Sequence, residues 1–145
     1  MWSSLSFRIG AAVLLSIVAG VPAFAADAVE PGQWKVTART EVAGTSMPAT
    51  VTTRCLHHED VAAIDKTFVP ELGGACRRVA FEWTGQKLSW RIQCTSPVAM
   101  DNSGTFLIDS PRHYTAVLTV GTKMNGQEMI SRTVLEGERV GDCPK

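Results

Sequence analysis

The stretch from Arg78 to Cys94 constrains the fold most strongly, because it has the residue pattern of a β-hairpin. Two runs that alternate apolar and polar residues, 79–84 and 87–94, flank the dipeptide Gly85-Gln86. A glycine at the first position suits a two-residue hairpin turn, since it readily adopts the positive φ that this turn requires. We therefore expect the rest of the chain to extend a sheet built on this hairpin.

The two-residue turn also determines which residues face each other across the hairpin. The expected pairs are Trp83 with Leu88, Phe81 with Trp90, and Val79 with Ile92. All six apolar side chains then lie on one face, where we expect burial to stabilise the fold by roughly 1.5–3 kcal/mol for each. A slip of one residue would turn Trp90 towards water, so the register should be well defined.

Five further runs have the alternating or β-branched pattern of strands. They cover residues 33–42, 49–55, 104–109, 113–122 and 128–139. Before the last run, Asn125-Gly126 is the strongest turn signal in the chain, because a type I′ turn needs φ > 0 at both central residues. The sequence therefore predicts a mainly β domain of about seven antiparallel strands, in a curved meander or partial barrel.

Residues 56–75 interrupt the β pattern. Glu59 and Asp60 suit a first helical turn, and they predict one short helix, about His58 to Lys66, between the second and third strands. The segment also contains six large apolar residues, namely Leu56, Val61, Ile64, Phe68, Val69 and Leu72. We expect these residues to plug an open edge or end of the sheet. The alternative is that the segment is a movable lid over a pocket.

Four aromatic residues are candidates for the lining of such a pocket. They are Trp34, Trp83, Trp90 and Phe68. A pocket lined by these side chains would favour an apolar small-molecule ligand. The competing interpretation is that the tryptophans belong to a closed core and have only a structural role.

The first 25 residues have the pattern of a cleaved signal peptide. Arg8 supplies a positive charge, and Ala23-Phe24-Ala25 offers a cleavage site. Between them, residues 9–21 form an apolar run that is shorter than the roughly 20 residues a membrane-spanning helix needs. The alternative is an uncleaved membrane anchor. Cleavage would leave residues 26–145 as a single domain, periplasmic or secreted, with no membrane anchor.

The four cysteines of an exported chain predict two disulfides, for which three connectivities exist. Strand alternation places Cys55, Cys76 and Cys94 at one end of the sheet. The hairpin register puts Cys76 opposite Thr95, so a small bulge would bring it to Cys94. Cys55 would then pair with Cys143, provided that a bend in the last strand returns Cys143 to the same end. The alternative pairing of Cys55 with Cys76 would instead close the loop that contains the helical segment.

The charges of the chain are balanced, with 14 basic and 14 acidic residues. Proteins that bind nucleic acids or anionic membrane surfaces need an excess of positive charge on one face. We therefore expect neither a nucleic acid nor a membrane surface as a partner.

His57 and His58 are the most suggestive candidates for metal ligands. Adjacent histidines point apart on a strand and about 100° apart on a helix, unlike an i, i+4 pair that shares one helix face. With only His113 elsewhere, a metal site would need ligands that the fold brings together. We interpret the pair as polar residues at a helix start and expect no bound metal.

No group of residues has a catalytic pattern. The nucleophile motif G-x-S-x-G is absent, and disulfide-bonded cysteines supply no thiolate. Glu136 and Glu138 lie two residues apart on an expected strand and so share a face, as paired catalytic carboxylates must. With Arg132 nearby, we interpret them as part of a solvated outer face, and we expect no active site and no cofactor.

Several short motifs occur in a characteristic order. They are Pro31-Gly32-Gln33-Trp34, Cys55-Leu56, Gly74-Ala75-Cys76, the hairpin that ends at Cys94, and Gly141-Asp142-Cys143. Together they resemble the exported bacterial domain of unknown function 3617, over nearly all of residues 26–145. Members often have Thr-Pro or Ser-Pro where this chain has His57-His58, so its helix start departs from the family pattern. The resemblance implies a periplasmic location and assigns no activity, substrate or catalytic residue.

The expected function is therefore that of a non-enzymatic binding module for an apolar small molecule or an envelope protein. An inhibitor-like module that acts on a hydrolase is the alternative, by analogy of architecture alone. An enzyme of unknown class comes third. An exposed apolar groove would favour the ligand binder, whereas a rigid polar loop projecting from a closed core would favour the inhibitor.

Overall fold

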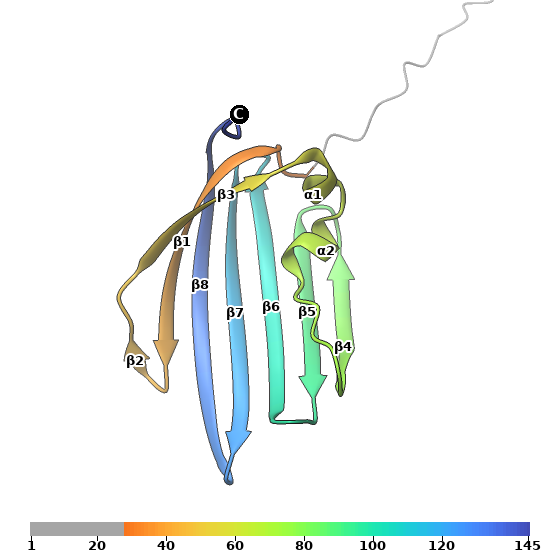
Figure 1. Ribbon diagram of the computed structural model, residues 1–145, viewed down its shortest axis with the longest axis vertical. Helices are drawn as coiled ribbons and strands as arrows, with labels where there is room; N and C mark the ends of the chain where they lie inside the picture. Colours follow the sequence, from red (N-terminus) through yellow and green to blue (C-terminus); the bar gives the residue numbers. More distant parts are fainter. Residues whose placement is uncertain (1–27) are drawn as a thin grey trace, which may run out of the picture.

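The computed structural model describes residues 28–145, so the predicted signal peptide lies outside the described residues. The strands are β1 (Gly32–Val42), β2 (Thr45–Ser46), β3 (Thr50–Leu56), β4 (Cys76–Trp83), β5 (Lys87–Cys94), β6 (Ala99–Ser110), β7 (His113–Met124) and β8 (Gln127–Gly141). The helices are α1 (His58–Ala62) and α2 (Ile64–Phe68). All eight strands form one antiparallel sheet of order β2-β1-β8-β7-β6-β5-β4, with β3 also paired to β1 (Figure 1).

The predicted mainly β, antiparallel fold is confirmed, with three differences in its elements. The additional strand, β2, has only two residues, lies between the predicted strands 33–42 and 49–55, and pairs with the end of β1. The helical segment is divided into two helices because the backbone of Ala63, at φ −123° and ψ 55°, departs from helical geometry. Strand β6 begins at Ala99, earlier than predicted, because the residues before Gly104, including the polar run 101–103, pair with β7 in the sheet.

The sheet is open, and β1 lies inside it rather than at its edge. Strand β1 pairs with β8 on one side and with β3 and β2 on the other, so the first and last strands of the domain are neighbours. Strand β4 forms the opposite edge. The chain therefore has to cross from β3 to β4, and the segment with α1 and α2 makes that crossing over one face of the sheet (Figure 1).

The register of the β4–β5 hairpin is confirmed next to the turn and wrong farther from it. Trp83 faces Leu88 and Phe81 faces Trp90, as predicted. The register then shifts between Arg78 and Ala80, so that Arg78 rather than Val79 faces Ile92. This is a β-bulge, which inserts one unpaired residue into a strand and is common at sheet edges.

The expected burial of the whole hairpin stripe is also wrong for its first arm. On β5, Leu88, Trp90 and Ile92 are at most 5% exposed. On β4, by contrast, Phe81 is 42% and Trp83 is 38% exposed. The reason is the position of β4 at the edge of the sheet, where no further strand covers its side chains.

Both predicted disulfides, Cys55–Cys143 and Cys76–Cys94, are confirmed. Their placement differs from the expectation, because they lie at opposite ends of the sheet. Gln33 of β1 pairs with Cys55 on one side and with Gly141 on the other, so Cys143 needs no bend to reach Cys55. The bulge in β4 aligns Cys76 directly opposite Cys94, as the second pairing required.

The helices lie on the face of the sheet that is turned to the viewer in Figure 1, here called the inner face. Apolar residues of the crossing segment are buried in the same core as Trp34, which is fully buried. They are Leu56, Val61, Ile64 and Val69. This burial is what the plug interpretation predicts for the part of the segment that contains α1 and α2. No helix within residues 28–145 is long and apolar enough to cross a membrane.

Candidate functional site

A row of aromatic side chains crosses the upper part of the inner face. Trp34 of β1 stacks on Tyr114 of β7, with ring centres 5.4 Å apart. Phe106 of β6 follows at 5.3 Å from Tyr114, and Trp90 of β5 at 5.8 Å from Phe106. The row arises because these residues occupy matching inward positions on strands that are neighbours in the sheet, apart from β1 and β7, which flank β8.

Phe68, at the end of α2, attaches the helix to this row. Its ring lies 4.7 Å from Phe106 and 5.4 Å from Tyr114, centre to centre. Aromatic pairs at such distances stabilise packing beyond the area that they bury. The end of α2 is therefore held over the middle of the sheet.

Two glycines make room for the large rings of the row. Gly104 lies opposite Trp90, and Gly137 lies opposite Tyr114. A methyl group added to either glycine would collide with the facing ring. Each aromatic side chain thus lies flat across the neighbouring strand, which keeps the inner face hollow below α2.

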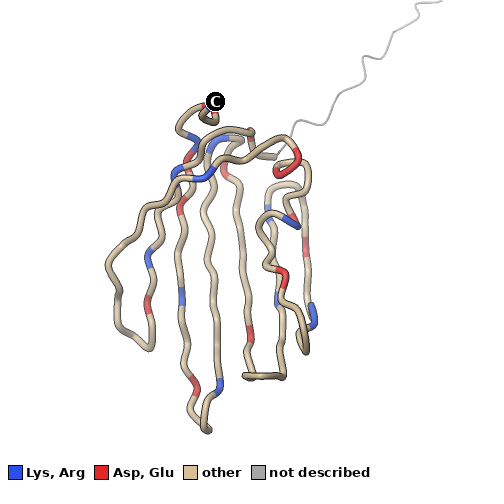
Figure 2. Tube along the Cα trace, viewed as in Figure 1, with Lys and Arg blue, Asp and Glu red and all other residues tan. Residues whose placement is uncertain are grey.

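Charged side chains are distributed unevenly over the sheet. The central strands carry none between Asn102 and Ile108 on β6 or between Tyr114 and Thr122 on β7 (Figure 2). The outer face, opposite the helices, holds ion pairs that link neighbouring strands. Among them are Lys87–Glu82 at 2.8 Å, Arg91–Asp101 at 2.6 Å and Lys35–Glu138 at 3.6 Å.

Hydrogen bonds in two of these pairs lower carboxyl pKa values. Lys87 holds the pKa of Glu82 below its usual value, chiefly through its hydrogen bond. The hydrogen bond from Arg91, with a second from Gln93, lowers the pKa of Asp101. These carboxylates are occupied by neighbouring basic groups on the outer face, so none is available to the inner face.

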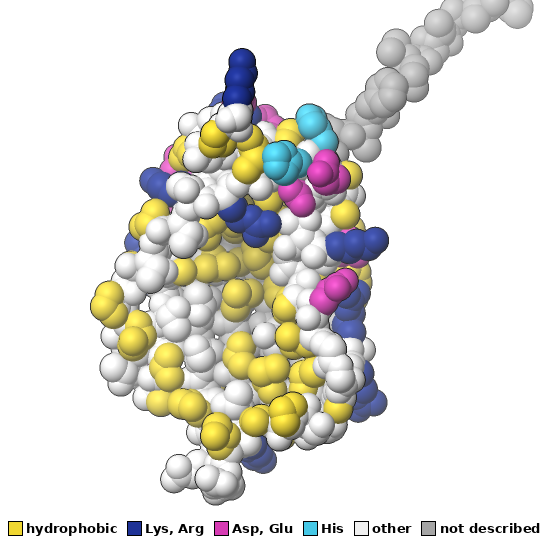
Figure 3. Space-filling model, viewed as in Figure 1, with side chains coloured by type: hydrophobic (Ala, Val, Ile, Leu, Met, Phe, Trp, Pro, Cys, Tyr) yellow, Lys and Arg dark blue, Asp and Glu magenta, His cyan; other side chains and the backbone are white. Residues whose placement is uncertain are grey.

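A cavity of about 430 Å³ lies between the end of α2 and the inner face. Its roof consists of residues 67–70, and its floor is formed by strands β5 to β8. The floor residues are Trp90, Asn102, Leu118, Val120, Ser131 and Thr133. None of the lining residues is charged. Figure 3 shows the hollowed face, on which hydrophobic side chains extend down from the helices towards the lower end.

The few polar groups on the floor of this cavity lie on both sides of β7. The indole nitrogen of Trp90 donates a hydrogen bond to Oδ1 of Asn102 at 3.0 Å. The hydroxyls of Thr133 and Thr40 lie 3.0 Å apart and share a hydrogen bond. The cavity therefore combines apolar walls with a small number of neutral hydroxyl and amide groups, as small-molecule sites do.

Residues 70–75, here called the strap, separate this cavity from two others. One, of about 350 Å³, reaches Met100 and Thr122 on the inner face. The other, of about 440 Å³, borders the edge strand at Arg78. The strap contributes Leu72 and the acidic residue Glu71 to both. Unlike the cavity under α2, these two include a charged residue.

The structure brings together two of the four aromatic residues predicted to line a pocket. Phe68 and Trp90 line the 430 Å³ cavity from opposite sides. Trp34 is buried in the aromatic row, and Trp83 lies at the open edge on β4. Apart from Trp90, the sequence did not identify the floor residues, such as Leu118, since their meeting depends on the order of strands in the sheet.

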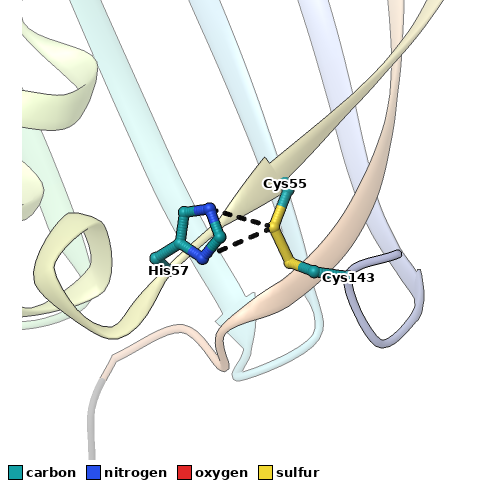
Figure 4. A group of neighbouring side chains, drawn as sticks. All are labelled: Cys55, His57 and Cys143. Atoms are coloured by element: carbon teal, nitrogen blue, oxygen red, sulfur yellow. Dashed lines mark hydrogen bonds between the residues drawn. A yellow bond between two sulfur atoms is a disulfide. The ribbon is translucent and has the colours of Figure 1, made fainter. Parts of the chain in front are cut away.

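The histidine pair predicted as candidate metal ligands is divided by the fold. His57 lies beside the Cys55–Cys143 disulfide, and its Nε2 is 3.5 Å from the Sγ of Cys55 (Figure 4). Cys55, His57 and Cys143 form a compact group of potential ligand atoms, which does not include His58. The two sulfurs are bonded to each other, however, and only a thiolate is a strong metal ligand. His57 instead immediately precedes α1, and its backbone N–H donates a hydrogen bond to Oδ2 of Asp60 at 2.8 Å.

Glu136 and Glu138 lie on the outer face, as predicted, and each has its own basic neighbour. Glu136 contacts His113 at 3.4 Å, and Glu138 contacts Lys35 at 3.6 Å. Both glutamates are exposed. The predicted neighbour Arg132 forms an ion pair with neither of them among the described residues. The arrangement is that of a solvated surface.

A comparison with protein families returns one match. The family model described as "Protein of unknown function (DUF3617)" matches residues 29–143, which confirms the resemblance seen in the sequence motifs. No curated protein and no solved structure matches the chain.

Proposed function

The chain belongs to the DUF3617 family, whose description assigns no activity, and we propose that it is a non-enzymatic binding module for an apolar small molecule. The ligand would occupy the cavity under α2. The observation that carries this proposal is the uncharged lining of that cavity, in a sheet whose Lys87–Glu82 and Arg91–Asp101 ion pairs lie on the outer face.

The size of the cavity supports a small ligand. Small-molecule sites have volumes of roughly 300–1,000 Å³ and combine apolar walls with a few polar groups. The 430 Å³ cavity lies in the lower part of this range. Its floor is only partly buried, because Leu118, Val120, Ser131 and Thr133 remain accessible below α2. A ligand could therefore enter from the lower end of the inner face.

We place this module in the periplasm or outside the cell. Two disulfides, Cys55–Cys143 and Cys76–Cys94, support an oxidising compartment, since disulfides form and persist there. The predicted signal peptide points to the same location. Fractionation of cells that express the full chain, followed by immunodetection, would test it.

The binding proposal is tested with a neutral fluorescent probe, N-phenyl-1-naphthylamine, whose emission increases in apolar surroundings. The wild-type protein should give a saturable increase. Val120→Trp should weaken binding at least about tenfold, a loss of about 1.4 kcal/mol, because the larger ring fills the cavity. Thr119→Trp is the matched control, since Thr119 is the neighbouring residue on the outer face of β7.

Thermal melting of both variants would establish that they fold. The absence of a saturable signal with the wild-type protein would contradict the proposal. Equal binding by the Val120→Trp and Thr119→Trp variants would contradict the assignment of the site to this cavity.

A further inference from the structure

Arg54 is a cationic neighbour of the proposed cavity on the inner face. It lies directly opposite Trp34 in the β1–β3 ladder, and residues that face each other share one side of a sheet. Its guanidinium carbon is 5.8 Å from the centre of the Phe68 ring. Phe68 in turn lines the cavity. Arg54 therefore stands at the upper border of the uncharged site.

The positive charge of Arg54 has no counter-charge among the described residues. Arg91 pairs with Asp101 at 2.6 Å and Arg139 with Asp142 at 2.6 Å, whereas within residues 28–145 Arg54 forms neither an ion pair nor a hydrogen bond. Its guanidinium lies instead over the face of the Phe68 ring. All of its N–H donors are thus free to bind an acceptor.

Tyr114 provides a second donor next to the Phe68 ring that Arg54 contacts: the ring centres of Tyr114 and Phe68 are 5.4 Å apart. Burial raises the pKa of Tyr114, which favours the protonated phenol. In the described part of the chain no side chain is hydrogen-bonded to this hydroxyl. A guanidinium and a protonated phenol both donate hydrogen bonds, and together they favour an anionic acceptor.

We propose that the ligand is a single-chain amphiphile with a carboxylate head, such as a long-chain fatty acid; this inference rests on the proposed function. The alkyl chain would occupy the uncharged cavity, and the carboxylate would bind Arg54 at its upper border. The planar guanidinium fork matches the geometry of a carboxylate, which it can bind through two parallel hydrogen bonds. The modest volume of 430 Å³ favours one chain over two.

The other cavities are less suited to this ligand. The 440 Å³ cavity is lined by three charged residues, Glu71, Arg77 and Arg78, so it lacks the uncharged lining that an alkyl chain requires. In the 350 Å³ cavity, Glu71 is the charged residue of the lining, and its carboxylate would repel an anion. Arg78 also stacks over Phe81 at 4.8 Å, a contact similar to that of Arg54 with Phe68. Arg78 is therefore a matched control for the loss of an exposed, ring-stacked arginine.

The experiment compares three ligands with the same alkyl chain, dodecanoate, dodecanol and dodecyltrimethylammonium, by displacement of the fluorescent probe at neutral pH. We expect dodecanoate to bind about threefold to tenfold more tightly than dodecanol, as a charge-assisted contact at a partly exposed site allows. The cationic ligand should bind most weakly. Arg54→Gln should abolish the preference for dodecanoate, Arg54→Lys should retain part of it, and Arg78→Gln should leave it unchanged.

Each other outcome has a distinct meaning. Equal affinity for dodecanoate and dodecanol, or a preference that survives Arg54→Gln, would overturn the carboxylate assignment while leaving the apolar site intact. Equal losses in the Arg54→Gln and Arg78→Gln variants would show a general effect of net charge and would also overturn it. If a lysophosphatidylglycerol bound more tightly than dodecanoate, the proposed carboxylate ligand would be overturned in favour of a lipid with an anionic phosphate headgroup. Failure of all ligands, with no binding of the neutral probe, would refute the proposed function itself.

Discussion

The upper and lower halves of the inner face belong to the same strands, yet they carry different side chains. Strand β1 contributes Trp34 above and Thr40 below, and β7 contributes Tyr114 above and Val120 below. The upper residues are buried beneath α1 and α2, whereas the lower ones are only half-buried. The alternation that defines the face is identical in both halves, so the difference comes from what covers them.

The two halves of this one surface therefore differ in role: the upper half is packed against the helices, and the lower half remains accessible. Large rings under the helices exclude water and join the helices to the sheet. Below α2, smaller aliphatic side chains alternate with hydroxyls that can be hydrated when no ligand is present. The upper half therefore has the composition of a core, and the lower half that of a binding surface.

The largest expected difference concerns local opening of the crossing segment. In α1 and α2, Val61 N–H donates to the carbonyl of His57 at 3.2 Å and Thr67 N–H to that of Ala63 at 2.9 Å. In the strap, Leu72 and Gly73 donate no backbone hydrogen bond among the described residues. Native-state hydrogen exchange should therefore find the strap amides at least about 100-fold faster than those of Val61 and Thr67.

This experiment also decides how much of the segment can act as a lid. The amide of Ile92 in β5 serves as the reference for exchange through global unfolding, since β5 is paired on both sides. If Val61 and Thr67 exchange as fast as Leu72, the whole segment opens and the plug interpretation fails. If Leu72 exchanges as slowly as Ile92, no part of it is a lid.

The second prediction compares the stability effects of truncation in the two halves. Trp34→Ala should lower the free energy of unfolding by about 3–5 kcal/mol, as truncation of a fully buried aromatic residue does. Val120→Ala, in the lower half, should cost about 1 kcal/mol or less, because its side chain is already partly exposed. Urea titration measures both, and equal losses would show that the two halves are one continuous core.

Local pattern predicted the strands and the hairpin turn well, because both depend on residues close in sequence. Asn125 and Gly126 have the positive φ values, 51° and 78°, that their turn required. The pairing of Trp83 with Leu88 and of Phe81 with Trp90 followed from turn length alone. The helices were also located correctly, apart from the break at Ala63.

Features that depend on strand order could not be predicted in the same way. The cysteine pairs were predicted correctly from a wrong arrangement, because an up-and-down order does not place β1 between β3 and β8. The exposure of Phe81 and the set of residues that form the cavity floor also depend on the order of strands. No local signal shows that β4 is an edge, or that Leu118 and Ser131 meet under α2.

The third prediction tests the close approach of a ring to a strand at the border between the two halves. Gly104→Ala places a methyl group against the Trp90 ring and should destabilise the protein by about 1–3 kcal/mol, the usual range for overpacking. Gly121→Ala is the matched control, because its nearest neighbour, a carboxylate oxygen of Glu128, would lie 3.7 Å from the new atom. A similar loss in both variants would mean that reduced chain flexibility, rather than the ring, determines the effect.

The smallest expected effect lies on the outer face, at His113. Partial burial of the ring lowers the pKa of His113, but hydrogen bonds to Asp109 at 2.9 Å and Glu136 at 3.4 Å outweigh it, so the pKa is raised overall. A raised pKa in the folded state stabilises the protein below the unfolded value of about 6.5, and this stabilisation is lost as the pH rises through the folded pKa.

His113→Gln should therefore lower the free energy of unfolding at pH 5.5 and have little effect at pH 8.5. Because the pair is partly exposed and screened by solvent, we expect a loss below about 1 kcal/mol. Urea titrations at the two pH values measure the difference, and Thr115→Gln, the next outward residue on β7, is the uncharged control. A loss in the His113→Gln variant that is larger at pH 8.5 would reverse the sign of the argument. It would mean that packing of the neutral His113 ring contributes more to stability than the ion pairs of the charged ring. The outer face, like the upper inner face, would then be stabilised by packing rather than by charge.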